Sequence, residues 1–255
     1  MKNSDDAVEQ FAQWIKDSDN IVFFGGAGVS TESGVPDFRS KDGLYNQHDV
    51  RFEKYRPEYL LSHSCLVNEP KVYYEFHRQK MDSRAIEPNN AHKYLTKLEE
   101  TGKLKGIVTQ NIDGLHQKAG SKNVYEIHGS ALRNYCMKCH KSCDEDYIFK
   151  SPEPIPYCEC GGIIRPDITL YEESLPENSV SSAIKCISEA DMMIIGGTSL
   201  TVYPAASFIE YFKGRYLVIV NRDNLNVKFN ANTLMVHEKI GEFFAKAACM
   251  QSIEL

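Results

Sequence analysis

The sequence predicts an α/β protein with a Rossmann-like, doubly wound parallel sheet and a small inserted zinc-ribbon and helical lobe. Two observations predict the sheet: short apolar runs that end at glycine or a polar residue recur along the chain, and segments with apolar residues at helical spacing lie between them. A third predicts the lobe, because a stretch with five cysteines, three prolines and two adjacent glycines, residues 134–164, interrupts this alternation.

Short apolar runs are the expected strands of the sheet, since each is too short for a typical helix. They span residues 21–24, 106–109, 124–127, 191–196 and 216–220. A first amphipathic helix is expected over 7–15, with Ser4 and Asp5 as cap candidates. Further helical patterns cover 91–98 and 180–187.

The chain of 255 residues is long enough for one sizeable core and a smaller appended lobe. We expect the larger domain to comprise residues 1–40, 84–133 and 165–255. The small lobe is expected from 41–83, which is irregular and rich in Tyr, Phe and His, together with 134–164. It would combine a helical module with a cysteine-rich module.

Composition disfavours several classes of protein. The formal net charge is -6 at pH 7, so nucleic acid is not expected as the main partner. The first ten residues, MKNSDDAVEQ, are polar and acidic, unlike a secretory signal, and no apolar run approaches the ~20 residues that span a bilayer. We therefore expect a soluble, cytoplasmic protein without a membrane partner, and we expect a monomer.

Gly25, Gly26, Ala27 and Gly28 follow the first expected strand and form a turn that suits a pyrophosphate. Glycine lets the backbone approach phosphates closely, and N–H groups at the start of a following helix attract their charge. The full dinucleotide fingerprint would need glycine at Thr31 and an acidic residue about 20 positions further on, so an ordinary dehydrogenase is disfavoured. A tight turn that binds no ligand is the alternative.

The residues after this turn are polar and include Pro36, so a loop, not a long helix, is expected over the site. Residues 25–39, GGAGVSTESGVPDFR, closely resemble the first motif of the sirtuins, the NAD-dependent protein deacylases. Three further blocks follow in the sirtuin order: TQNIDGLH at 109–116, HGS at 128–130 and GTSLTVYPA at 197–205. With the cysteine module, the resemblance spans nearly the whole chain.

The resemblance implies a reaction in which the carbonyl oxygen of an acyl-lysine displaces nicotinamide from NAD. This chemistry needs a dry pocket, a held leaving group and a base that activates a ribose hydroxyl. His128 is the expected base, because it follows an expected strand and because the ordinary pKa of histidine, about 6.5, suits a base at neutral pH. Asn111 would position the ribose and Asp113 would accept from the carboxamide of nicotinamide. Turn capping is the alternative role for Asn111, Asp113 and Gln110.

Matching the motifs assigns further residues to NAD. Phe38 is expected over the reacting ribose, where its ring would exclude water, and Gln110 at ribose hydroxyls. Arg39 is expected to bind the phosphates or to order its loop, whereas His116 is expected to be structural. The expected cofactor-binding set is Gly26, Ala27, Gly28, Thr31, Phe38, Arg39, Gln110, Asn111, Ile112, Asp113, His128, Thr198, Ser199, Asn221 and Ile240.

Eight cysteines in a cytosolic chain are not expected to form disulfides, and their clustering indicates metal. Cys136 and Cys139, spaced C-x-x-C, with Cys158 and Cys160, spaced C-x-C, resemble a zinc ribbon in which four thiolates hold one structural Zn2+. The second pair is one residue shorter than usual, so it needs a tight knuckle, and Cys143 is a reserve ligand. A redox pair and plain buried thiols are the alternatives.

The resemblance further implies that an acetyl-lysine peptide adds as a strand between two chain segments, a form of β-augmentation. The matching positions here are Tyr171, Glu172 and Val202. Glu172 replaces a glycine of the family, which changes this edge. Our hypothesis is that Glu172 and Glu173 favour peptides with Lys or Arg beside the target lysine.

Sirtuins that remove succinyl groups carry Tyr-x-x-Arg in a helix of the small lobe, where the arginine pairs with the acyl carboxylate. The corresponding segment at 72–78 reads VYYEFHR, so Tyr73 is followed by Phe76 and Tyr74 by His77, with Arg78 one position further. We therefore expect deacetylation well above desuccinylation.

The expected function is NAD-dependent deacetylation of protein lysines, with transfer of the acetyl group to ADP-ribose and release of nicotinamide. Mono-ADP-ribosyl transfer shares the loss of nicotinamide and is one alternative, although the presence of His128 favours deacylation. A catalytically idle protein that senses NAD or ADP-ribose by binding is the other.

Overall fold

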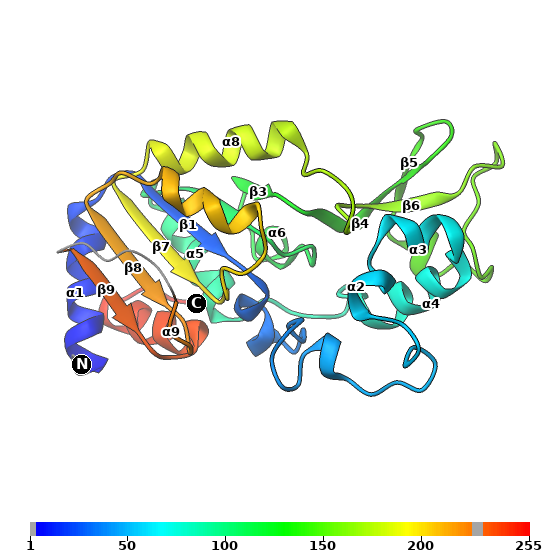
Figure 1. The fold of residues 1–255 in the computed structure, drawn as a ribbon. Coiled ribbons are helices and arrows are strands. Elements are labelled where there is room, and N and C mark those ends of the chain that lie inside the picture. The colour runs from blue at the N-terminus through cyan, green and yellow to red at the C-terminus, as the bar shows by residue number, and fades with distance from the viewer. Residues whose placement is uncertain (1–3, 226–231) are drawn as a thin grey trace.

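A six-stranded parallel sheet forms the centre of the larger domain within residues 4–225 and 232–255, which the computed structural model describes (Figure 1). Its strand order is β3-β2-β1-β7-β8-β9, so the order reverses between β1 and β7. The predicted doubly wound, Rossmann-like sheet is confirmed. The strands are β1 (Ile21–Gly25), β2 (Leu104–Thr109), β3 (Val124–Glu126), β7 (Met192–Gly196), β8 (Tyr216–Val220) and β9 (Thr233–Val236).

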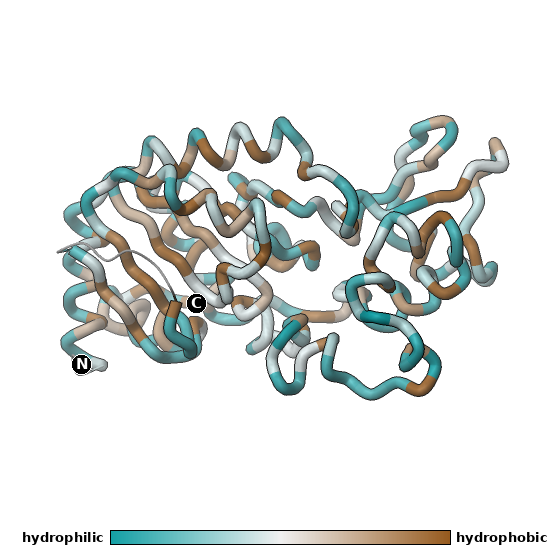
Figure 2. Tube along the Cα trace, viewed as in Figure 1, coloured by the Kyte–Doolittle hydropathy of each residue, from teal (hydrophilic) through white to brown (hydrophobic). Residues whose placement is uncertain are grey.

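Helices cover both faces of this sheet, which explains why its strands are continuous apolar runs. On β1, Ile21 and Phe23 pack on one face, whereas Val22 and Phe24 pack on the other. Figure 2 shows the hydrophobic residues concentrated along the strands. One face carries α1 (Ser4–Asp17), α5 (Asn90–Glu100) and α9 (Ile240–Met250), and the other carries α8 (Glu177–Ser188) and the 3-10 helix η4 (Ala205–Tyr211); the short α6 (Leu115–Lys118) lies between β2 and β3 in the chain.

A second, antiparallel sheet of order β5-β4-β6 lies in the small lobe, beside four short helices of the described chain. The two inserted segments pack on each other, because Tyr74 Oη donates to Ile164 O at 2.6 Å and Arg78 Nε donates to Ile148 O at 2.9 Å. The elements are β4 (Gly129–Cys136), β5 (Ser142–Asp144), β6 (Ile164–Ile168), α2 (Pro57–Leu60), α3 (His63–Asn68), α4 (Pro70–Lys80) and α7 (Asp146–Phe149).

The sequence patterns did not predict β4, β5, β6 or β9. Each of these strands is short or interrupted by proline and charged residues, so its apolar alternation is weak. Strand β4 begins at Gly129, ahead of the predicted lobe boundary at residue 134, and the domain boundaries stay a prediction. Within the described residues, no helix is long and apolar enough to cross a membrane.

Candidate active site

A cavity of about 550 Å³ opens at the carboxyl ends of β1, β2, β7 and β8. Its walls include the glycine turn at 26–28 after β1, residues 110–112 after β2, 197–199 after β7 and 221–225 after β8. Ligands of open α/β sheets bind beyond the carboxyl ends of the strands, at the point where the strand order reverses, and here that point is at the ends of β1 and β7. The cavity therefore lies where a nucleotide is expected.

The glycine turn packs directly against the turn that follows β7. Gly28 N donates to Gly197 O at 2.8 Å, and a Cβ added to Gly28 would lie 2.8 Å from Gly197 Cα. After this contact the chain forms two single-turn 3-10 helices, η1 (Ala27–Val29) and η2 (Thr31–Ser33), instead of a long helix. The loop predicted from Pro36 and its polar neighbours is thus present over the cavity.

A buried hydrogen-bond network links the residues that follow β2 to the glycine turn. Ser30 Oγ donates to Asp113 Oδ2 at 2.7 Å and accepts from Asn111 Nδ2 at 3.0 Å. Asn111 lines the cavity, whereas Asp113 lies behind it, and burial raises the pKa of Asp113. Leu115 N donates to Asp113 Oδ1 at 2.9 Å. Asp113 is therefore linked to the cavity wall through Ser30, which bonds to Asn111, and no sequence pattern marked Ser30 for this place.

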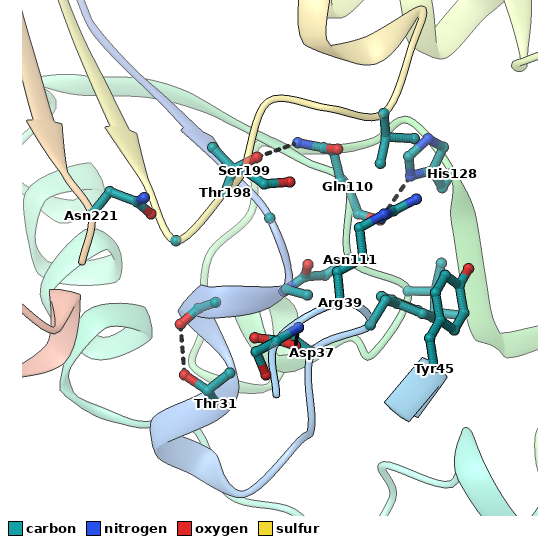
Figure 3. A pocket seen from close by; sticks show the side chains of 18 of the residues that line it. Thr31, Asp37, Arg39, Tyr45, Gln110, Asn111, His128, Thr198, Ser199 and Asn221 are labelled. Atoms are coloured by element: carbon teal, nitrogen blue, oxygen red, sulfur yellow. Dashed lines mark hydrogen bonds between the residues drawn. The ribbon is translucent and has the colours of Figure 1, made fainter. Parts of the chain in front are cut away.

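His128 follows β3 and is half-buried at the cavity wall (Figure 3). Its Nδ1 lies 2.9 Å from Gln110 O. A carbonyl oxygen only accepts, so Nδ1 carries the proton and Nε2 keeps its lone pair. Within the described residues Nε2 has no hydrogen-bond partner. Burial lowers the pKa of His128, partly opposed by the bond to Gln110, so the imidazole is neutral at pH 7.

The turn after His128 fixes the position of the backbone that carries its ring. Gly129 has φ +78°, and a Cβ there would lie 2.0 Å from Asp167 O. Thr169 N donates to His128 O at 2.9 Å, so both sides of the backbone at position 128 are held. Only glycine fits after this histidine, which explains the sequence HGS.

Polar side chains from several strand ends line the rest of the nucleotide side (Figure 3). Gln110 Nε2 donates to Thr198 Oγ1 at 3.1 Å, and Asn221 Nδ2 donates to Asp223 O at 2.9 Å. Ser199 lines the same wall. Apart from Asp113, every residue of the predicted cofactor-binding set lines this cavity, as do the three residues predicted to bind the peptide.

Apolar side chains line the end of the cavity next to the small lobe. The ring of Phe38 packs edge-on against Tyr45, with ring centroids 5.6 Å apart. The remaining apolar lining residues at this end are Leu61, Met81, Ile112, Ile168 and Leu170. Such a lining accommodates an uncharged hydrocarbon chain and excludes water.

Tyr171 holds the edge of the cavity against the small lobe. Tyr171 N donates to Leu61 O at 3.0 Å, and Tyr171 O accepts from His63 N at 3.1 Å. Glu172 follows with φ +75°, a conformation that suits the glycine it replaces. Its Oε2 accepts from Ser64 N at 2.9 Å, and this bond lowers the pKa of Glu172.

Glu173 also lines the cavity, but its charge is paired. Arg165 forms a two-pronged ion pair with it, and His63 Nδ1 lies 2.9 Å from Glu173 Oε1. Burial alone would raise the pKa of Glu173, but the hydrogen bonds from Arg165 and Leu170 N lower it to about 2. The hypothesis that two acidic residues select the peptide therefore narrows to Glu172, which is exposed and ionised.

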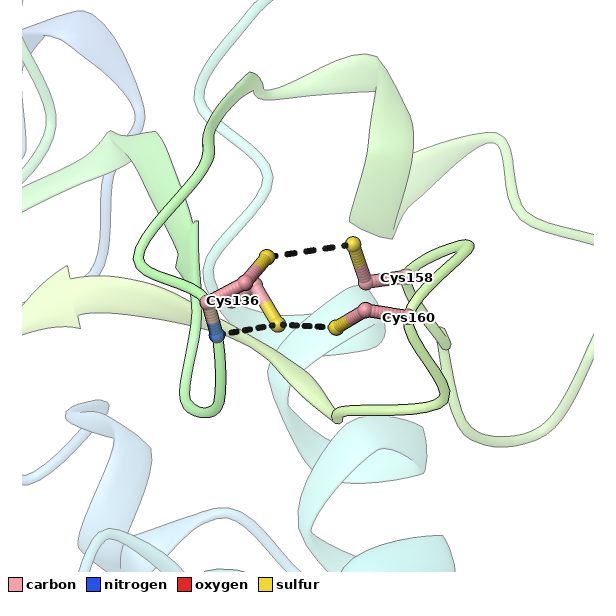
Figure 4. Close-up of side chains that lie close together, drawn as sticks. Cys136, Cys158 and Cys160 are labelled. Atoms are coloured by element: carbon pink, nitrogen blue, oxygen red, sulfur yellow. Dashed lines mark hydrogen bonds between the residues drawn. The ribbon is translucent and has the colours of Figure 1, made fainter.

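The four predicted zinc ligands come together in the small lobe (Figure 4). The sulfur atoms of Cys136, Cys139, Cys158 and Cys160 lie within 4.8 Å of one another, with Cys136 and Cys160 3.5 Å apart and Cys139 and Cys158 3.7 Å apart. Tetrahedral Zn–S bonds of about 2.3 Å require sulfur separations of about 3.8 Å, so this donor set fits zinc. Cys143 lies outside the set.

The short second pair closes because the backbone can turn tightly after Cys160. A Cβ at Gly162 would lie 2.7 Å from Cys136 Sγ. Cys139 N and Lys138 N donate to Cys136 Sγ, which lowers the pKa of that thiol and favours the thiolate that binds metal.

Comparisons with known proteins agree with this geometry. The family model described as "Sir2 family" matches residues 26–204, which is more than half of the chain. The chain belongs to the Sir2 family. It is 52% identical over 238 residues to an NAD-dependent protein deacetylase of Clostridium acetobutylicum, covering 93% of this chain and 96% of that one. It is 48% identical over 235 residues to one of Cutibacterium acnes, covering 92% and 94%.

Solved Sir2 structures share the whole fold. One of Sir2 bound to an acetylated peptide has a TM-score of 0.85 at 33% identity, and one of Sir2 with a peptide and NAD+ has a TM-score of 0.83 at 34% identity. Each covers 100% of both chains. The sirtuin resemblance inferred from the motifs is confirmed.

Several lining residues had no signal in the sequence patterns. Tyr45, Leu61 and Met81 come from the irregular segment before residue 84, where no motif marked them. Glu32 lies inside the first motif, yet its role was not evident: its Oε2 accepts from Gly241 N at 2.7 Å, so the protein's own carboxylate caps the start of α9. Glu32 and Gly241 are 209 positions apart in the chain, so their contact leaves no local pattern in the sequence.

We expect Cys160→Ala to lose the bound zinc and to unfold at a lower temperature, because a structural site with three remaining thiolates no longer encloses the ion. Cys143→Ala is the matched control and should keep one zinc per chain, since its sulfur lies outside the cluster. Metal analysis by mass spectrometry and thermal melts measure both effects. Loss of zinc from Cys143→Ala, with retention in Cys160→Ala, would show that the ligand set is wrong.

Proposed function

We propose that this Sir2-family protein is an NAD-dependent protein lysine deacetylase that transfers the acetyl group to ADP-ribose and releases nicotinamide. One observation carries the proposal: the free Nε2 of His128 and the side chain of Asn111 line the same cavity as the glycine turn. Curated relatives bear the name of this activity, and similar Sir2 structures hold an acetylated peptide or NAD+.

The cavity offers each part of NAD a suitable environment. The backbone of the glycine turn and the hydroxyls of Thr198 and Ser199 suit the diphosphate, and Asn221 suits the adenosine ribose. When bound, NAD supplies an electrophilic anomeric carbon with nicotinamide as its leaving group. Asn111, held by Ser30, would orient the reacting ribose and the carboxamide beside it. Asp113 would hold Ser30 in place through the hydrogen bond that it accepts from Ser30 Oγ, and Ser30 would in turn hold Asn111.

His128 would be the base that takes a proton from a ribose hydroxyl. Its Nδ1–H is engaged with Gln110 O, which leaves only Nε2 to accept. Once the acyl oxygen has displaced nicotinamide, removal of that proton would let the ribose oxygen bond to the acyl carbon. With the addition of one water, the lysine amine would leave and the acetyl group would stay on the sugar as an ester. The base role requires a neutral imidazole, and burial favours that state.

The peptide would add as a strand at the edge formed by Tyr171 to Glu173. Tyr171 uses its own N–H and C=O for the small lobe, whereas Glu172 lies in a turn, with φ +75° and with Glu173 N donating to Leu170 O at 3.1 Å. Within the described residues the N–H and C=O of Glu172 have no partner, and Val202 lies on the facing loop. The acetyl-lysine chain would enter the apolar end beside Phe38.

Mildly acidic net charge and the free, clustered cysteines support a cytoplasmic protein that does not depend on nucleic acid. We further propose that it acts as a monomer, because all parts of the cavity come from one chain. Light scattering after size-exclusion chromatography measures this mass directly.

Incubation with NAD and an acetyl-lysine peptide should give deacetylated peptide, nicotinamide and O-acetyl-ADP-ribose. His128→Ala should lower kcat by about 100-fold or more, because a positioned base is lost. The acid limb of the kcat/KM profile, which reports the free enzyme, should lie below pH ~6.5, since burial lowers the pKa of His128 and the neutral form persists to lower pH. Mass spectrometry of the three products is the measurement.

The outcome also separates the alternatives. A binding sensor would release no nicotinamide, and a mono-ADP-ribosyltransferase would label protein without needing acetyl-lysine. Either result would contradict the deacetylase proposal.

Removal of the charge of Glu172 should weaken selection of basic peptides. In Glu172→Gln the amide oxygen still accepts from Ser64 N, so only the charge is lost. We expect the preference for Lys or Arg flanks, measured as a ratio of kcat/KM values, to fall about threefold, as for an exposed charge pair. Glu189→Gln, an exposed site at the end of α8, is the control. An unchanged ratio in Glu172→Gln would exclude this role.

Acetyl-lysine peptides should react well above succinyl-lysine peptides. Arg78 cannot pair with an acyl carboxylate, because its guanidinium donates to the carbonyl oxygens of Ile148, Glu153 and Pro154 at 2.8 to 3.1 Å. His77 is buried, and burial lowers its pKa to about 3, so it carries no charge. Comparison of kcat/KM for the two peptides tests this, and faster desuccinylation would refute it.

A further inference from the structure

The hydroxyl of Tyr171 joins the peptide edge of the cavity to the loop at 37–46. Tyr171 Oη lies 2.9 Å from Tyr45 Oη and accepts from Arg39 Nη2 at 3.2 Å. The guanidinium of Arg39 in turn lies over the Tyr45 ring, 5.5 Å from its centroid. Two walls from distant parts of the sequence therefore meet through one side-chain cluster, of which Arg39 and Tyr45 are labelled in Figure 3.

Tyr45 is firmly connected to Phe38 within its own loop. Tyr45 N donates to Phe38 O at 2.9 Å, and Leu44 N donates to Asp37 O at 2.7 Å. The rings of Phe38 and Tyr45 pack at an interplanar angle of 65°. A displacement of Tyr45 would therefore move the aromatic ring proposed to cover the reacting ribose.

Tyr171 is equally fixed at its other end. Its backbone bridges Leu61 and His63, and the segment on which it lies is the proposed docking edge for the peptide. A peptide strand that orders this edge would also order the Tyr171 hydroxyl, and through it the loop that carries Phe38.

We infer that Tyr171 is a positioning residue that couples peptide binding to closure of the 37–46 loop, and that this coupling keeps water from the reacting ribose. The inference rests on the proposed function and deepens it. Burial and the neighbouring Tyr171 raise the pKa of Tyr45, so its hydroxyl stays protonated and the bond between the two rings persists at neutral and mildly alkaline pH.

An open loop would have a defined chemical consequence. Water in place of the acyl oxygen would cleave the bond between nicotinamide and ribose, giving nicotinamide, ADP-ribose and one proton from NAD+ and water. Deacetylation yields one nicotinamide per deacetylated peptide. The ratio of nicotinamide to deacetylated peptide therefore reports leakage separately from overall activity.

Tyr171→Phe and Tyr45→Phe each remove the bond between the two hydroxyls and leave the rings in place. Tyr45→Phe loses only this bond and should raise the open fraction of the loop, and with it the rate of NAD hydrolysis without deacetylation, about fivefold. Tyr171→Phe also loses the bond from Arg39 Nη2 and should raise that rate at least as much. The double variant should leak little more than Tyr171→Phe alone, because both changes remove the same bond. Tyr94→Phe is the matched control: it loses a hydroxyl bond to Gln251, away from the cavity, and should keep a ratio of one.

Hydrogen exchange gives a readout that needs no turnover. The amides of Leu44 and Tyr45 should exchange faster in Tyr171→Phe and Tyr45→Phe than in the wild type or Tyr94→Phe, since their bonds to Asp37 and Phe38 lie in the same loop. Unchanged exchange with a nicotinamide ratio of one in both variants would overturn the inference, as would an equal rise in Tyr94→Phe. Wild-type protein that yields no deacetylated peptide would instead refute the proposed function, while the exchange comparison would still test the coupling of the two walls.

Discussion

Direct backbone contact between two glycine turns, at the ends of β1 and β7, is the constraint on which the rest of the site depends. A Cβ on Gly28 would meet Gly197, and one on Gly197 would lie 2.3 Å from Val29 N. Because no side chain separates the turns, the distance between Thr31 on one and Thr198 on the other is set by the sheet itself. The nucleotide side of the cavity is therefore as rigid as the strands that carry it.

The opposite side of the cavity is built differently. Its walls come from the loop after Pro36, the segment before residue 84 and the strand end at Tyr171, which are joined by side chains more than by backbone ladders. With zinc bound, the four-cysteine cluster would cross-link β4 to the chain before β6 and so add to the stability of this lobe. The side of the cavity at the glycine turns is thus held by the sheet, whereas the side next to the small lobe is held by a few side-chain contacts.

The motif residues could be placed from the sequence because each block directly follows a strand. Carboxyl ends of parallel strands converge, so Gln110, Thr198 and Asn221 were expected to share a cavity although the chain separates them widely. Contacts that join irregular segments could not be predicted in this way. Neither the pairing of Arg165 with Glu173 across a turn nor the meeting of Tyr45 with Tyr171 leaves any periodic pattern. Strand β9 was not predicted because its four residues, TLMV, are too few to form a recognisable pattern.

The glycine at position 129 has a mechanical consequence for the histidine before it. The ladder between β4 and β6 begins at Gly129, which pairs with Ile168, so one of the chain connections between the central sheet and the small lobe runs through the residue next to His128. Because a Cβ at position 129 would lie 2.0 Å from Asp167 O, the two chains meet here without an intervening side chain. The backbone that carries the proton acceptor is therefore anchored to both domains at once.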